Sequence, residues 1–133
     1  MIRDLAGFAR VTGGVLQGEN AAFGPVVSDS RTLEPGSLFV ALAGERFDGH
    51  DFVAQAAALG AAGAVVSRQV AATVAQVVVP DTLDALTRFA HAWRRDFSGT
   101  VVGITGSTGK TTVKEMTGAI LAVCGPCLVT SGN

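Results

Sequence analysis

The sequence has few charged residues, very little lysine or cysteine, and no tyrosine. Charged residues make up 16% of the 133 residues, the formal net charge is −1, and the lysines are Lys110 and Lys114. Such a composition forms no basic field that would favour nucleic acid or an anionic membrane. The sequence therefore predicts no nucleic-acid partner, and a phosphate ligand would have to be held by local geometry.

Long apolar segments are also missing. No run reaches the roughly 20 apolar residues that span a bilayer. The N-terminal stretch MIRDLAGFARVTGG lacks an apolar core of the length that a signal peptide needs. We therefore expect no membrane insertion and a cytoplasmic location.

The two cysteines, Cys124 and Cys127, have the spacing C-x-x-C. This spacing occurs in redox pairs and in half of a zinc site. The pair follows a predicted helix, whereas thiolate activation normally uses a helix N-terminus. No second Cys/His pair is present to complete a zinc site. We interpret both residues as structural, reduced thiols.

The hydrophobic share of 48% supports a buried core. Residues 1–80 predict a helix over 2–11, strands at 26–27 and 38–42, and short apolar strands in AGAVVS and AQVVVP. Between these strands, Phe52, Ala56 and Leu59 fall on one helical face. This order of strands and helices is typical of a small α/β domain.

Residues 81–99 predict a connecting helix. Asp81 and Thr82 are candidate N-caps, and Trp93 is interpreted as a core residue. His91 lies beside the apolar stripe without a partner for a metal site. The stripe itself consists of Leu83, Leu86, Ala90, Trp93 and Phe97.

Residues 100–133 predict the opening β-α-β unit of a P-loop fold. We expect a buried strand over 100–105, a glycine-rich loop, a helix over 110–123 and a strand beginning in CLVTSGN. The apolar face of the helix would be formed by Val113, Met116 and Ile120. The predicted fold class is thus α/β, with a small N-terminal domain followed by the opening of a P-loop ATP-binding domain.

The loop GITGSTGKTT predicts a phosphate site. Gly106 and Gly109 allow backbone conformations in which successive N–H groups point inward, and the helix that follows adds its positive end. Lys110 supplies a charge for phosphate oxygens, and Thr111 supplies a hydroxyl suited to Mg²⁺. Ile104 stands where the general pattern has its first glycine, so a chance glycine-rich turn is the alternative. The expected ATP-binding residues are Gly106, Ser107, Thr108, Gly109, Lys110, Thr111 and Thr112, with Lys110 and Thr111 also catalytic.

With Ile104 in place of that glycine, GITGSTGKTT resembles the phosphate loop of the Mur ligases. These are the ATP-dependent amide-forming enzymes of peptidoglycan precursor synthesis. The stretch SDSRTLEPGSLFVALAGERFDGHDFVAQAAALGAAGAVV is similar to their uridine-nucleotide-binding domain. TTVKEM and TSGN look most like the members that add D-alanyl-D-alanine. The resemblance covers residues 24–133.

The resemblance implies a ligase that joins D-alanyl-D-alanine to UDP-N-acetylmuramoyl-tripeptide, with ATP and Mg²⁺ as cofactors and a monomeric full-length protein. It implies that residues 1–80 bind the UDP end and that residues 100–133 begin the ATP-binding domain. The implied substrate residues are Ser28, Ser30, Arg31, Glu45, Arg46 and Phe47. Turn formation remains an alternative explanation of both stretches. In the first stretch the turn would be formed by Asp29 and Ser30. In the second it would be formed by Asp48-Gly49, with His50 or Asp51 as a cap.

Members of this family have three domains, so we expect this chain to be the N-terminal portion of a longer ligase and to be inactive alone. Three alternatives remain open from the residues. The chain could belong to the ligase that adds the third amino acid, to a stand-alone P-loop nucleotide-binding module, or to a fragment that only binds a uridine nucleotide.

Overall fold

The computed structural model describes residues 1–132. The chain divides into two compact units, which begin at Met1 and at Gly99, and the first unit ends at Ser98. The first unit contains a five-stranded sheet in the order β1-β5-β4-β3-β2. Its strands are β1 (Val15–Gln17), β2 (Val26–Val27), β3 (Leu38–Val40), β4 (Gly63–Val66) and β5 (Gln76–Val78). The last four strands are mutually parallel, and β1 pairs antiparallel with β5 at the edge.

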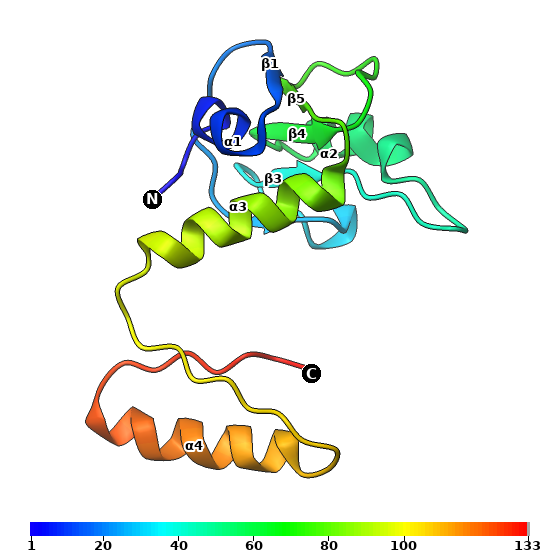
Figure 1. The fold of residues 1–133 in the computed structure, drawn as a ribbon. Coiled ribbons are helices and arrows are strands. Elements are labelled where there is room, and N and C mark those ends of the chain that lie inside the picture. The colour runs from blue at the N-terminus through cyan, green and yellow to red at the C-terminus, as the bar shows by residue number, and fades with distance from the viewer. Residues whose placement is uncertain (133) are drawn as a thin grey trace. The chain divides into compact units, whose positions relative to one another are not determined.

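Helices cover both faces of this sheet (Figure 1). The first face is covered by α1 (Leu5–Thr12) and α3 (Thr82–Asp96), which pack Phe8 and Phe89 against each other with ring centroids 4.9 Å apart. The second face is covered by α2 (Val53–Ala58). Alternate residues of β3 point to opposite faces, so Leu38 and Val40 join one core cluster and Phe39 joins the other.

Most predicted elements of the first unit are present, with shifted boundaries. The first helix begins at Leu5, where Asp4 accepts a hydrogen bond from the Gly7 N–H as the N-cap. Asp81 caps α3 in the same way, as predicted. The strand β1 was not predicted, because a three-residue strand with two exposed side chains has little pattern to detect.

Two predicted helical faces were wrong in part. In α2 the buried residues are Val53 and Ala56, while Phe52 and Leu59 are exposed. The reason is that Phe52 ends the 3-10 turn η2 (Gly49–Phe52), so the helical register begins one residue later. In α3 the buried residues are Thr82, Ala85, Phe89 and Ala92, whereas the predicted Leu83, Ala90 and Phe97 are exposed. Trp93 packs against the core, as predicted.

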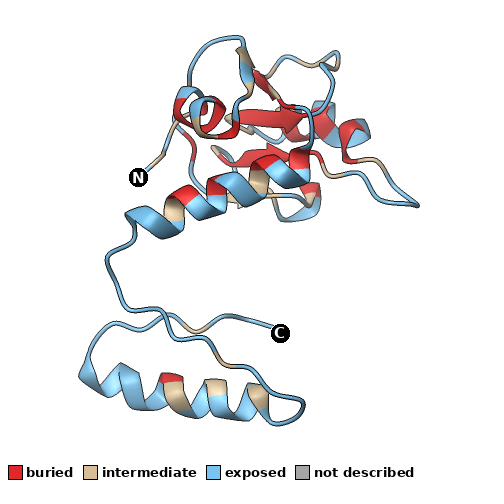
Figure 2. Cartoon of the chain, viewed as in Figure 1, coloured by how far each residue is buried: buried red, intermediate tan, exposed pale blue. Residues whose placement is uncertain are grey.

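The second unit contains one helix, α4 (Lys110–Cys124), close to the predicted bounds. The strand predictions for 100–105 and from 127 were wrong for the described residues, which form no strand there. A strand needs a hydrogen-bonded neighbour, and none of the described strands pairs with these segments. The predicted apolar face of α4 is exposed at Val113, Met116 and Ile120 (Figure 2). Asn133, the last residue of CLVTSGN, lies outside the described residues.

No helix within residues 1–132 is long and apolar enough to cross a bilayer.

Candidate functional site

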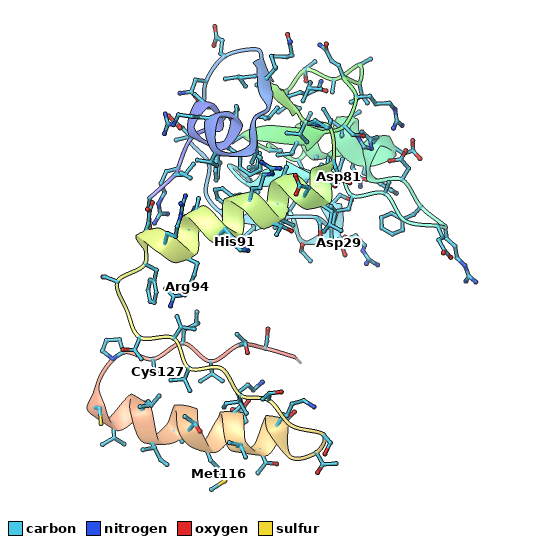
Figure 3. The ribbon with its side chains drawn as sticks, viewed as in Figure 1. Asp29, Asp81, His91, Arg94, Met116 and Cys127 are labelled. Atoms are coloured by element: carbon cyan, nitrogen blue, oxygen red, sulfur yellow. The ribbon has the colours of Figure 1, made fainter. Side chains whose placement is uncertain are left out.

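The polar segments of the first unit gather where its parallel strands end. Residues 28–31 follow β2, residues 41–50 follow β3, Ser67 and Arg68 follow β4, and Asp81 follows β5. Because the carboxyl ends of parallel strands meet at one edge, these segments share an edge of the sheet (Figure 3 labels Asp29 and Asp81). Ligands of open α/β sheets bind outside this edge, so we place the candidate site of the first unit there.

The turn after β2 is organised by Asp29. Its carboxylate accepts the Arg31 N–H at 2.9 Å and pairs with the Arg31 guanidinium, with the shortest N···O distance 2.7 Å. This guanidinium, followed by the backbone N–H, lowers the pKa of Asp29 to about 2. Ser28 and Arg31 are exposed, whereas Ser30 is buried within the turn. The turn therefore presents Ser28 and Arg31, and both the turn chemistry and a ligand role fit the same stretch.

Residues 43–48 form a hairpin arm beyond β3 (Figure 1). Ala43 and Asp48 form an antiparallel bridge at its base, and the Gly44 N–H donates to the Phe47 carbonyl at 2.9 Å near its tip. The predicted substrate residues Glu45, Arg46 and Phe47 occupy this tip and are all exposed.

The base of the arm passes close to the end of β3. A Cβ on Gly49 would lie 2.7 Å from the Leu42 carbonyl oxygen and 2.8 Å from the Leu42 nitrogen. Both are backbone atoms and cannot move aside cheaply. Glycine at position 49 is therefore required for the arm to return to the sheet.

The base of the arm is tied to the end of β4 through His50. Asp48 Oδ1 accepts the His50 backbone N–H at 2.9 Å and lies 2.6 Å from His50 Nδ1, while Asp48 Oδ2 accepts from Arg68 at 2.9 Å. On the other side of the ring, the Ser67 backbone N–H donates to His50 Nε2 at 2.9 Å. The His50 backbone N–H, then Arg68, then the His50 ring hold the pKa of Asp48 well below its usual range. The predicted cap for this turn was His50 or Asp51, but the N-cap is Asp48 itself.

The order Ser67, His50, Asp48 matches the contacts of a hydrolase triad, since Ser67 Oγ lies 3.1 Å from His50 Nε2. A backbone N–H can only donate, so it already occupies the lone pair of Nε2. His50 also exposes only 2% of its side chain. The ring therefore cannot serve as a base for Ser67, and the contacts indicate a structural link.

The predicted phosphate loop lies before α4 in the second unit. Gly109 is the N-cap of α4 in the left-handed region, with φ 78°, and a Cβ there would meet no atom within 4 Å. Lys110 Nζ donates to the Gly106 carbonyl at 2.7 Å, so the ammonium group lies against the loop that precedes it. Ser107, Thr108, Thr111 and Thr112 are exposed beside it. The loop, the start of α4 and the lysine thus lie together, as a phosphate site requires.

The described residues contribute little to a metal site. No group of three or more carboxylate, imidazole or thiol side chains within residues 1–132 could hold a metal ion. Thr111, the residue that we expect to bind Mg²⁺, lies in the first turn of α4. Cys124 and Cys127 are both free and exposed, so neither has the structural role in a core that we expected.

A cavity of about 630 Å³ opens at the opposite edge of the sheet. Its wall contains Gln17, Glu19 and Thr73 together with several alanines, among them Ala61 and Ala62. The wall contains no arginine, lysine or histidine. A phosphorylated ligand would therefore find no cation there, and the carboxyl edge is the better candidate.

The network of Asp48, His50, Ser67 and Arg68 was missed by reasoning from sequence. The available signal was composition, because the chain has only two histidines and one of them directly follows Asp48-Gly49. Its partner Ser67 is 17 residues away, and no sequence spacing predicts that contact.

Comparison with known proteins identifies a family for this arrangement. Residues 24–94 match the family profile described as Mur ligase family, catalytic domain. The UDP-N-acetylmuramoyl-tripeptide–D-alanyl-D-alanine ligase of Escherichia coli (strain K12) is 49% identical over 123 residues. The match covers 92% of this chain and 27% of that enzyme.

Solved structures agree. A crystal structure of MurF from Acinetobacter baumannii matches with a TM-score of 0.86 and 42% identity, covering 95% of this chain and 29% of that one. MurF ligase from Thermotoga maritima, solved in complex with ADP, matches with a TM-score of 0.65 and 39% identity over 74% of this chain and 23% of that one. The chain thus spans less than a third of the length of these relatives.

Proposed function

Because this chain belongs to the Mur ligase family, we propose that its protein is an ATP-dependent ligase that joins D-alanyl-D-alanine to UDP-N-acetylmuramoyl-tripeptide in peptidoglycan precursor synthesis. The observation that supports this most strongly is the presence of two separate polar assemblies. One lies at the carboxyl edge of a parallel sheet, and the other is a glycine-rich loop with a lysine at a helix N-terminus. A ligase of this kind must bind a nucleotide sugar and a triphosphate, and each assembly fits one of them.

In this proposal residues 1–80 bind the UDP end, residues 81–99 connect, and residues 100–133 open the ATP-binding domain. Ser28 and Arg31 would contact the uridine or the diphosphate, with Ser30 supporting their turn. Glu45, Arg46 and Phe47 would contact the nucleotide sugar from the arm. Arginine suits this role because its planar guanidinium binds phosphate oxygens in pairs.

The phosphate loop would hold the triphosphate of ATP. The acceptor carboxylate attacks the γ-phosphorus, the bond to the β-phosphate oxygen breaks, and ADP leaves. The amine of D-alanyl-D-alanine then attacks the acyl phosphate, phosphate departs, and the amine loses a proton. Since two anions must approach each other in the first step, the Lys110 ammonium and the loop N–H groups would lower the barrier by neutralising charge.

Magnesium would add charge neutralisation at the phosphate oxygens, with the Thr111 hydroxyl as the ligand from this chain. Thr111 is the residue directly after Lys110 in the first turn of α4, which supports this assignment. We also propose that the full-length protein acts as a monomer in the cytoplasm.

Calorimetry on the chain tests the phosphate assignment. Lys110→Met should weaken ADP binding by about tenfold or more, because one charge-assisted contact to phosphate is lost. The matched control is Lys114→Met, which removes the other lysine; Lys114 Nζ donates instead to the Thr130 carbonyl at 2.8 Å. Equal affinities in the two variants would contradict the assignment.

The same method tests the nucleotide-sugar assignment. UDP-N-acetylmuramoyl-tripeptide should bind the chain, and Arg46→Met should weaken it several-fold. Arg10→Met is the control, since Arg10 is an exposed arginine on α1. Binding that is lost with Arg10→Met and kept with Arg46→Met would reject the carboxyl edge as the site.

A further inference from the structure

His50 stands apart from every other ionisable side chain of the chain. Within residues 1–132 it is the only ionisable residue that is buried. Burying an ionisable ring is unfavourable unless its polar atoms are paired. Both ring nitrogens of His50 have partners, one on the arm and one at the end of β4.

These partners determine the protonation of the ring. The Ser67 backbone N–H donates to Nε2, so Nε2 carries no proton. The proton of the neutral ring must then lie on Nδ1, which faces Asp48 Oδ1 at 2.6 Å and donates to it. His50 therefore acts as a donor toward the arm and an acceptor toward the sheet, and only the neutral Nδ1–H tautomer does both.

The contacts of Asp48 carry this link into the arm. Asp48 forms the last bridge of the arm with Ala43, and its second carboxylate oxygen accepts from Arg68, the residue after Ser67. The arm is thus joined to the end of β4 by two routes, one through the His50 ring and one through Arg68. The tip residues 44–47 have no such anchor of their own apart from the Gly44–Phe47 turn bond.

We propose that His50 is a positioning residue whose neutral Nδ1–H ring clamps the base of the 43–48 arm to the end of β4 and so fixes the arm for binding the nucleotide sugar. This inference rests on the proposed function for its ligand. A clamp raises affinity because an arm that adopts its binding orientation only a fraction of the time binds with a dissociation constant larger by the inverse of that fraction.

Three variants separate clamping from simple core filling. His50→Phe keeps a ring of similar size without hydrogen bonds. His50→Gln keeps one donor and one acceptor in a side chain that does not titrate. His91→Gln is the matched control, because His91 is the other histidine and is exposed on α3.

The first measurement is the nitrogen NMR spectrum of the two histidines at neutral pH. The expected result is an Nδ1-protonated His50 with an unprotonated Nε2. The second is calorimetry with UDP-N-acetylmuramoyl-tripeptide, well below the thermal midpoint of each variant. We expect His50→Phe to raise the dissociation constant by about tenfold, His50→Gln to restore most of the affinity, and His91→Gln to match the wild type.

A protonated Nε2 at neutral pH would overturn the proposal, as would unchanged affinity in His50→Phe. If the wild-type chain binds no nucleotide sugar, the proposed function fails for this edge, and the clamp is then judged without ligand. In that case backbone relaxation of residues 44–47 must show greater mobility in His50→Phe than in the wild type. Equal mobility would overturn the clamp.

Discussion

The two units each contain a helix of 15 residues, and these helices differ in what they bury. Helix α3 buries Thr82, Ala85, Phe89 and Ala92, although its sequence is rich in charge. Helix α4 has the more apolar sequence, yet Gly118 is its one buried residue within the described chain. Burial in this chain is therefore decided by the partners a helix finds and not by its own composition.

The two helices accordingly owe their positions to different causes. Packing fixes α3, whose Phe89 contacts Phe8, Phe23 and Trp93. Local geometry begins α4, where Gly109 adopts the left-handed conformation before the first turn. Substitutions in the first unit should thus change global stability, and those in the second should act locally.

The largest expected difference in the free energy of unfolding is between two truncations of apolar side chains to alanine, one in each unit. Phe8→Ala should lower the free energy of unfolding by about 3–5 kcal/mol, because Phe8 is fully buried and its removal leaves a cavity. Ile120→Ala on α4 should change it by less than about 0.5 kcal/mol, because Ile120 is 65% exposed. Urea unfolding followed by circular dichroism measures both. Similar losses would show that the apolar side of α4 is packed in solution.

A hydroxyl deletion sharpens the comparison within a single helix. The Thr82 hydroxyl donates to the Ala41 carbonyl at 2.8 Å in a buried place. Thr82→Val should therefore cost about 1–3 kcal/mol, since a buried acceptor loses its partner. Thr87→Val on the same helix is the control, because its hydroxyl bonds the Leu83 carbonyl at the exposed surface. Thermal melts compare the two, and an equal effect would point to helix propensity instead of the buried bond.

The start of α4 should respond to backbone conformation alone. Gly109→Ala forces a side chain into φ 78° and should cost the second unit about 1–2 kcal/mol. Gly103→Ala also places its Cβ in open space but at a residue without positive φ, so it should have little effect. Backbone chemical shifts of residues 110–113 report the fraction of helix. A fully helical first turn in Gly109→Ala would refute the local account.

The smallest effect is expected from an exposed ion pair in the well-packed unit. The pKa of Asp29 is lowered from 3.8 to about 2, chiefly by the Arg31 guanidinium. A depressed pKa means that the ionised carboxylate stabilises the fold above pH 3.8 and that this contribution is lost as the pH falls toward 2. Thermal midpoints measured across this range should fall less steeply for Asp29→Asn than for the wild type.

Arg31→Met should also make the thermal midpoint depend less on pH, because it removes the partner of Asp29 and leaves the carboxyl group of Asp29 in place. The side chains of this pair are 40% and 86% exposed, so screening by water keeps the effect small. Parallel profiles for wild type and both variants would mean that the pair does not persist in solution.

Short sequence patterns predicted those elements of the fold that depend on neighbouring residues in the chain. The strands β2 to β5 could be found because short apolar runs lie close to a glycine or proline on one side, and the helix bounds followed from Asp81 and from Lys110. The buried face of α3 could not be found, because apolar residues occur on both sides of it and the choice depends on α1. Likewise the strand expected at 100–105 needs a neighbouring strand, which its own residues cannot supply.

The candidate site residues also fall into two groups, those contiguous in sequence and those brought together by strand pairing. The loop around Lys110 is contiguous in sequence and could be predicted as a unit, as could the stretches 28–31 and 45–47. The clamp at His50 depends on Ser67 and Arg68, which reach it only through the pairing of β3 with β4. Contacts that cross a sheet are decided by register, and register is not visible in a single stretch of sequence.

The first three residues are held by the rest of the first unit. The amino group of Met1 lies 3.3 Å from Asp96, the Ile2 carbonyl accepts from the indole of Trp93, and the guanidinium of Arg3 stacks on that indole at 5.1 Å. A segment fused ahead of Met1 would replace the amine by an amide. It would also crowd Trp93, the only tryptophan in the chain. For purification, an affinity label should therefore not be fused ahead of Met1.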